Sequence, residues 1–401
     1  MTEFEDRAQT VLEKLQRALA SIIGEYGDPA IIRPVDICEF MGIDMNLAWK
    51  VSRLVNSTDV FSLGKYLPGR KAIGNFCVKA LESNCSSRKV NDLREAFIDL
   101  EKLKRTYAGS RKELEIMLAN LSVEERAGND SIHRRKSFEG NCYTFGIQSD
   151  VQLSSVILTP ARSGNNMLDI CRIRGHIGLF LIRPDVPWRV ASTYILDSTG
   201  KIKSTPHRDF LFPINDGEPP LVREFCSAEL PDFGSVTSRS GRTSYFLKGM
   251  GMGKTSAINL FTAEVIRDTG ILYRKSPDDG VALNNSSRTP TRKIVVEVFM
   301  PGEFSSSPYQ LEMWSRLFCS DDMSQMTPGD LLPLNEQPVL FSAGRAPVPV
   351  PGVPEYCNLI ESCFHNLGED PADYRLLRLT VDYPPIPSSI DVLLGLPEKN
   401  R

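Results

Sequence analysis

Residues 33–55 read RPVDICEFMGIDMNLAWKVSRLV, and this stretch predicts two short helices joined by a tight turn. Pro34 suits the first turn of a helix, where its missing N–H costs nothing. Gly42 stands where that helix would end in a left-handed residue. Asp44 is a strong N-cap for a second helix. The local chemistry alone therefore places a helix, a turn and another helix here.

The second of these helices divides into two faces. Leu47, Val51 and Leu54 share one face and are expected to pack on Ile37 and Met41 of the first helix. The other face carries long side chains that can reach base edges and phosphates. These outward residues are Met45, Asn46, Trp49, Lys50 and Arg53.

This arrangement resembles the helix-turn-helix regulator superfamily, with the motif at residues 33–56. The residues that carry the resemblance are Cys38, Gly42, Ile43, Leu47, Val51 and Leu54, although the superfamily more often has Ala where Cys38 stands. The resemblance covers about two dozen residues and identifies a superfamily rather than a single family. It implies that the second helix enters the major groove of double-stranded DNA. Asn46 would then contact adenine edges, and Lys50 and Arg53 would contact guanine or phosphate, with Trp49 on the same face.

Positive charge is concentrated around the motif. Residues 33–112 hold 15 Lys and Arg against 9 Asp and Glu, a balance of +6, whereas the whole chain carries −3. Neutralising phosphates requires such a local excess. Arg70 and Lys71 are therefore assigned to the DNA backbone, with further cations at Lys102, Lys104, Arg105, Arg111 and Lys112.

An alternative interpretation of the same segment is a helical domain that docks a protein partner in a structural assembly. Amphipathic helices joined at a glycine are common, and an exposed Trp such as Trp49 is often a protein-contact anchor. Both interpretations describe a protein that is not an enzyme.

The rest of the chain predicts an α+β fold, with an N-terminal all-α domain at 1–121 and a β-rich domain with a few packed helices at 141–401. The polar, charged segment 122–140 is interpreted as a linker. The predicted strands are 143–147, 151–158, 168–174, 177–182, 189–196, 293–299 and 376–383, where apolar residues alternate with polar ones or run together. The predicted helices of the β-rich domain are 255–267, one after Pro308 and one after Pro354, the last ending before Gly368.

The run from Gly249 to Thr255, GMGMGKT, is close to a phosphate-binding loop. The pattern G-x-x-x-x-G-K-[ST] requires glycine at the position that Lys248 occupies. The loop is therefore interpreted as a glycine-rich turn before a helix, and nucleotide binding is the third and weakest hypothesis.

Composition sets the remaining expectations. No apolar run approaches the roughly 20 residues of a membrane span, and the acidic N-terminus lacks a signal-peptide pattern, so a cytoplasmic protein is expected. The nine cysteines form no C-x-x-C pair and the four histidines are far apart, so neither a metal nor another cofactor is expected. The prediction is a homodimeric DNA-binding transcriptional regulator whose β-rich domain serves oligomerisation or sensing of an unknown effector.

Overall fold

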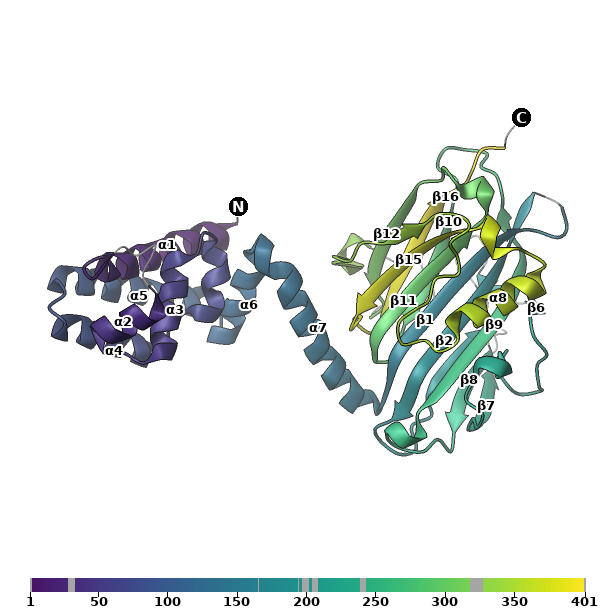
Figure 1. Ribbon diagram of the computed structural model, residues 1–401, viewed down its shortest axis with the longest axis horizontal. Helices are drawn as coiled ribbons and strands as arrows, with labels where there is room; N and C mark the ends of the chain where they lie inside the picture. The colour runs from purple at the N-terminus through teal and green to yellow at the C-terminus, as the bar shows by residue number, and fades with distance from the viewer. Residues whose placement is uncertain are drawn as a thin grey trace. The chain divides into compact units, whose positions relative to one another are not determined.

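The computed structural model describes residues 2–27, 33–164, 166–193, 195–196, 202–203, 208–238, 243–317 and 327–399. The chain forms two compact units, Met1–Asp130 and Ser131–Arg401. The first is built of helices and the second around β-sheets, so the fold is α+β as predicted (Figure 1).

The first unit begins with a capping box. The Thr2 hydroxyl accepts a hydrogen bond from the Glu5 N–H at 3.3 Å, and the Glu5 carboxylate accepts one from the Thr2 N–H at 3.1 Å. Apolar residues from Ala8 to Leu118 then form one buried core. The elements of this unit are α1 (Glu3–Ile23), α2 (Pro34–Met41), α3 (Met45–Asn56), the 3₁₀ helix η1 (Val60–Tyr66), α4 (Arg70–Glu82), α5 (Ser87–Tyr107) and α6 (Arg111–Leu121).

The segment predicted as a linker is helical over most of its length. Helix α7 spans Val123–Phe145, and the division between the two units falls inside it. It covers nearly all of 122–140. It also covers most of 143–147, so the strand predicted there is wrong. A polar helix of this length lacks the apolar periodicity on which the prediction relied.

The second unit is organised by a large mixed sheet with the strand order β14-β15-β11-β1-β2-β9-β6 in the described part of the chain. Its central strands β1 and β11 run parallel, whereas β1 and β2 are antiparallel. The strands are β1 (Ile147–Pro160), β2 (Met167–Leu181), β6 (Arg208–Phe210), β9 (Ile258–Ile271), β11 (Thr291–Met300), β14 (Val339–Phe341) and β15 (Arg375–Asp382).

Smaller sheets accompany the large one. The order β10-β16-β12-β13 makes a second sheet, β3-β8-β7 a third, and β4 pairs with β5. Their bounds are β3 (Arg189–Thr193), β4 (Ile195–Leu196), β5 (Ile202–Lys203), β7 (Asp232–Thr237), β8 (Thr243–Lys248), β10 (Gly280–Ser287), β12 (Tyr309–Ser315), β13 (Leu331–Leu332) and β16 (Ser388–Gly395).

The large sheet is covered on both faces. Along β1, Leu153 and Ile157 join the core beneath helix α8 (Tyr356–Leu367), which lies across this face in Figure 1. Val156 and Leu158, one residue out of phase, join the core shared with the sheet of β10 and β16. This alternation is the period of two that a strand imposes on its side chains. The unit thus stacks a helix, the large sheet and a second sheet.

Two predicted helices of this unit are wrong. Residues 255–267 fall mostly in β9, and the segment after Pro308 forms β12. In β9, apolar side chains such as Leu260, Phe261 and Val265 are buried on both faces of the sheet. A strand covered on both sides carries an almost continuous apolar run, which periodicity cannot distinguish from a buried helix.

Other predictions for this unit are confirmed. Strands β1 and β11 contain the segments predicted as 151–158 and 293–299, and β15 contains all but the last residue of 376–383. The segment 168–174 and all but the last residue of 177–182 belong to the single strand β2. Helix α8 ends at Leu367, and Gly368 follows it with a φ of 77°, the left-handed conformation expected after a helix. Among the described helices, none combines the length and the apolar composition that crossing a bilayer requires.

Candidate nucleic-acid interface

The turn between α2 and α3 has the geometry that its sequence predicts. Gly42 adopts φ 61° and ψ 35°, and its N–H donates to the Cys38 carbonyl oxygen at 2.9 Å. Asp44 caps α3, because its carboxylate accepts a hydrogen bond from the Leu47 N–H at 3.0 Å. The Cys38 thiol donates to the Ile43 carbonyl oxygen at 2.9 Å, which ties the end of α2 to the turn. These contacts fix the orientation of α3 relative to α2.

The start of α2 is held by an acidic residue. The Asp36 carboxylate accepts from the Arg33 N–H at 2.9 Å and pairs with the Arg33 guanidinium at 2.9 Å. Hydrogen bonds from Arg33 lower the pKa of Asp36 below its usual value. Asp36 therefore partly neutralises the positive charge of Arg33, the residue that precedes α2.

Helix α3 has the two faces expected of a recognition helix. One face packs into the unit's core, with Leu47, Ala48, Val51 and Leu54 at most 5% exposed. Among the predicted DNA contacts on this helix, Lys50 is half-buried, and Asn46, Trp49 and Arg53 are exposed. These four contacts lie at helical spacings of three and four residues, so they share one surface.

Aromatic contacts organise part of this surface. The Trp49 ring makes an edge contact with Tyr66 of η1, with 5.2 Å between the ring centroids. The Arg53 guanidinium lies over the Trp49 ring, 5.6 Å from its centroid. Trp49 nevertheless remains 41% exposed. The sequence does not reveal the role of Tyr66, because its segment has the composition of a loop and nothing local marks a contact with α3.

The two backbone cations predicted outside α3 lie at the start of α4, in the first turn of that helix. Lys71 is exposed, and Arg70 is 74% exposed in its side chain and approaches Glu101 of α5 at 3.8 Å. No hydrogen bond, ion pair or ring contact among the described residues joins either cation to α3. The structure thus brings Asn46, Trp49, Lys50 and Arg53 together, and leaves Arg70 and Lys71 on a separate element.

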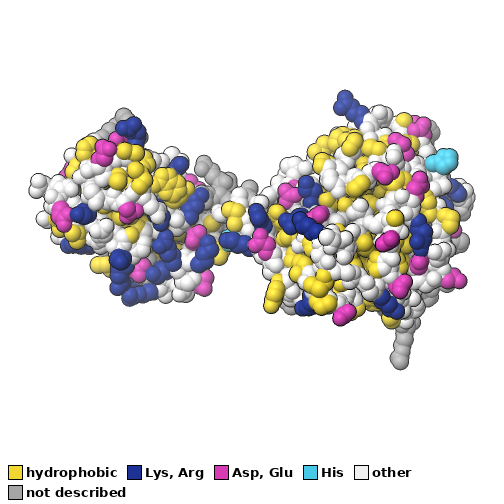
Figure 2. Space-filling view, turned by 60° about the horizontal axis from the view of Figure 1, so that its bottom comes forward, with side chains coloured by type: hydrophobic (Ala, Val, Ile, Leu, Met, Phe, Trp, Pro, Cys, Tyr) yellow, Lys and Arg dark blue, Asp and Glu magenta, His cyan; other side chains and the backbone are white. Residues whose placement is uncertain are grey.

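Several other predicted phosphate contacts already have partners inside the unit. Lys104 pairs with Glu101 at 2.7 Å, and Lys112 pairs with Glu115 at 2.9 Å. Arg111 donates to the Leu67 carbonyl oxygen. The Lys112 side chain is 56% exposed, and an exposed pair contributes about 0–1 kcal/mol, so a phosphate can compete for this cation. Figure 2 shows Lys and Arg side chains gathered on one part of the helical unit's surface.

The glycine-rich loop does not have the geometry of a phosphate loop. After Gly253, with φ 80°, residues Lys254–Ser256 make one 3₁₀ turn, and β9 begins at Ile258. No α-helix starts here, so the backbone N–H groups that would surround a phosphate are not aligned on the end of an α-helix. In the described residues, no group of three or more His, Cys, Asp or Glu is arranged to hold a metal ion.

Comparisons with known proteins leave the family open. No family model and no curated protein match the chain. One solved structure, described as a "putative protease" from Parabacteroides distasonis, aligns with 12% identity and a TM-score of 0.27. The alignment covers 63% of this chain and 41% of that one, so the chain spans less than half of its length. A similarity this low carries no argument about fold or function.

Proposed function

We propose that this protein is a homodimeric, non-enzymatic transcriptional regulator that acts in the cytoplasm and binds double-stranded DNA through α3. The observation that carries the proposal is the turn at Gly42 and Asp44. It joins two helices whose inner faces are buried, while Asn46, Lys50 and Arg53 are left on the outer face of the second. Such a division of faces is what major-groove recognition requires.

Charge supports the same conclusion. Lys50 and Arg53 have no carboxylate partner among the described residues, so binding a phosphate would not require an existing ion pair to break. Residues 33–112 carry a net charge of +6, whereas the whole chain carries a net charge of −3. Release of counterions from DNA would then supply much of the affinity.

The test measures affinity and its salt dependence. Fluorescence anisotropy would follow the full-length protein binding to fragments that it selects from a pool of its own genomic DNA. Replacing Lys50 and Arg53 with Ala is expected to weaken binding and to reduce the slope of log K against log salt by about 2, since each phosphate contact contributes about 0.9.

The control makes the same change of charge elsewhere. Arg7→Ala with Arg17→Ala removes two exposed cations of α1 and should leave specific binding nearly intact. Binding that is absent or insensitive to salt, or equally weakened by the control pair, would overturn the proposal. Light scattering of the same samples measures whether the protein is a dimer.

A second candidate function is assembly with a protein partner through the same helices. Large apolar side chains are exposed on α2 and α3, including Val35, Phe40 and Met45, at 45%, 52% and 48%. Replacing Phe40 and Met45 with Ser distinguishes the two functions. Loss of a defined oligomer with unchanged DNA affinity supports assembly, whereas unchanged oligomeric state with weakened DNA binding supports the DNA interface.

A further inference from the structure

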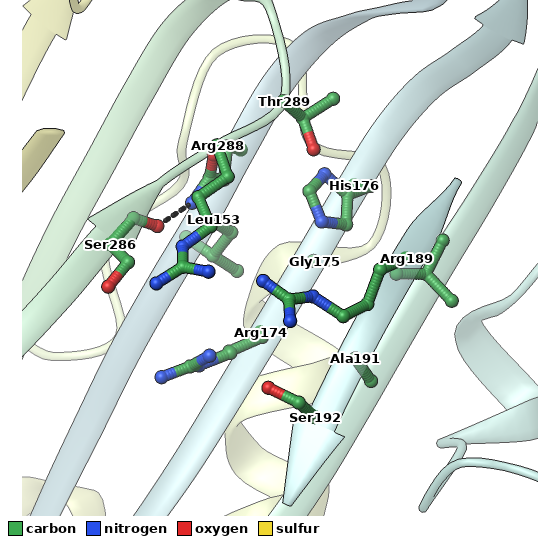
Figure 3. A pocket seen from close by; sticks show the side chains of 12 residues that line it. Leu153, Arg174, Gly175, His176, Arg189, Ala191, Ser192, Ser286, Arg288 and Thr289 are labelled. Carbon is green, nitrogen blue, oxygen red and sulfur yellow. Dashed lines mark hydrogen bonds between the residues drawn. The ribbon is translucent and has the colours of Figure 1, made fainter. Parts of the chain in front are cut away.

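A small cavity opens in the second unit where three segments meet. Its volume is about 70 Å³. It lies on the face of the large sheet opposite α8, between β1 and β2, strand β3 of another sheet, and the turn that follows β10 (Figure 3). The lining residues are Gln152, Leu153, Arg174, Gly175, His176, Arg189, Val190, Ala191, Ser192, Ser286, Arg288 and Thr289.

Three arginines from different segments point into this cavity. Figure 3 shows the guanidinium groups of Arg174, Arg189 and Arg288 gathered in one part of the cavity that they line. The twelve lining residues include no Asp or Glu. Arg174 and Arg189 are half-buried and make no ion pair with any described residue. Like charges brought together with little water repel one another, and an anion between them would remove that cost.

A half-buried histidine completes the polar lining. His176 lies two residues from Arg174 on β2, so both side chains leave the strand on the same face. Its Nδ1 atom is buried and has no hydrogen-bond partner in the described part of the chain. Burial, reinforced by Arg174, lowers the pKa of His176 to about 4, so the ring is neutral at pH 7. A neutral imidazole donates one N–H and accepts at its other nitrogen. Buried polar groups are nearly always hydrogen-bonded. The unpaired Nδ1 atom of His176 is therefore expected to form a hydrogen bond with a bound ligand.

A larger apolar cavity adjoins the first and shares Arg189 and Arg288 with it. Its volume is about 490 Å³, within the range of roughly 300–1,000 Å³ for small-molecule sites. Aromatic and aliphatic side chains dominate its walls. Besides the two shared arginines it is lined by Phe145, Pro187, Trp188, Phe246, Arg316, Ile386 and Pro387.

We propose that these two cavities form one binding site for a small organic anion. A phosphate or carboxylate group would be held by Arg174, Arg189 and Arg288, with His176 as a neutral hydrogen-bonding partner. An aromatic or aliphatic body would occupy the adjoining cavity against Trp188 and Phe246. Arginine suits this role because its planar fork binds both oxyanions in a bidentate manner. This inference is independent of the proposed DNA interface, which lies in the other unit.

The test is calorimetric titration of the full-length protein at fixed ionic strength. The probes are inorganic phosphate, phenyl phosphate, benzoate and phenol. Phenyl phosphate or benzoate should bind at least tenfold more tightly than phosphate or phenol, because only these probes fill both cavities. The order of phenyl phosphate and benzoate identifies the oxyanion that the site prefers. Equal affinity for all four probes, or no binding of any, would overturn the proposal.

Variants then locate the bound anion. Arg174→Met and Arg189→Met should each weaken the better probe at least tenfold, with unchanged circular dichroism. Arg345→Met removes an exposed cation of the same unit and should leave affinity unchanged. The proposal fails if the two cavity variants bind like the wild type or if Arg345→Met weakens binding as much. It also fails if the cavity variants lose affinity for DNA while small anions never bind, since the arginines would then contact nucleic acid.

Discussion

The Glu297 carboxylate is fully buried in the second unit, and both of its oxygens have partners. The Arg378 guanidinium donates to it at 2.7 Å, the Tyr356 hydroxyl at 2.8 Å and the Ser155 hydroxyl at 2.5 Å. These residues come from α8 and three strands of the large sheet. A buried charge is tolerable only with such compensation, and removing one member leaves the others unpaired.

Replacing Glu297 with Gln should therefore lower the free energy of unfolding by about 3–5 kcal/mol, because Arg378 keeps a buried charge without its counterion. Urea denaturation followed by tryptophan fluorescence measures the change. Glu139→Gln is the matched control in the same unit, since Glu139 and Arg135 form an exposed pair on α7 and should lose less than about 1 kcal/mol. Equal effects of the two substitutions would contradict this account of the network.

His176 gives the protein a defined dependence of stability on pH. Its pKa is about 4 in the folded chain, against an ordinary value of 6.5, because burial disfavours the charged ring. Between these values the unfolded chain binds a proton that the folded chain does not, so stability falls as pH falls from 6.5 toward 4. The wild type should lose about 3 kcal/mol more than His176→Gln over this interval. Urea unfolding of both proteins at a series of pH values measures the difference, and parallel curves would show that His176 does not titrate as described.

At the scale of elements, the α2–α3 turn depends on one left-handed residue. Gly42 has φ 61°, and a Cβ atom placed on it would meet no atom within 4 Å. A side chain at position 42 would therefore fit without a steric clash. Only the left-handed backbone conformation disfavours a residue other than glycine. Gly74, in the middle of α4, likewise has open space around the position of a Cβ atom but has ordinary helical geometry.

These two glycines should respond to alanine with opposite signs. Gly42→Ala is expected to destabilise the helical unit by about 1 kcal/mol, the cost of a left-handed conformation for a residue with a side chain. Gly74→Ala should stabilise it by up to about 1 kcal/mol, because alanine favours the helix interior. Thermal unfolding followed by far-ultraviolet circular dichroism measures both. A loss of stability at Gly74 equal to that at Gly42 would show that conformation is not the cause.

At the scale of the whole molecule, the hydrophobic cores belong to separate units. The core of the helical unit uses buried residues from Ala8 to Leu118, and the three cores of the second unit begin at Ile147. Ser122, just after α6, closes the first unit with a hydrogen bond to Asp59 at 2.6 Å. A unit with its own core can fold alone.

A chain shortened to residues 1–122 should therefore fold by itself and melt in a single cooperative transition. Its affinity for DNA fragments should be weaker than that of the full-length protein if the second unit supplies the dimer contact, because one half-site is then bound at a time. Circular dichroism and anisotropy measure the two properties. A gradual, non-cooperative melt would show that the helical unit needs the rest of the chain.

Elements whose signals are local can be predicted from the amino-acid sequence. The N-cap Asp44, the left-handed glycines Gly42 and Gly368, and helical periodicity placed α2, α3 and α8, because each signal acts within a few residues. The outward face of α3 followed from the same periodicity.

The remaining features depend on contacts between segments that are distant in the sequence. Whether residues 258–271 form a helix or a strand depended on pairing with β2, a long-range contact that periodicity does not contain. The contact of Tyr66 with Trp49 joins separate elements, and Arg174, Arg189 and Arg288 come from three distant segments. A cavity forms where elements distant in the sequence pack together, so no local sequence pattern predicts it. The sequence was thus enough to predict which side chains α3 exposes, whereas tertiary packing alone created the arginine-lined cavity.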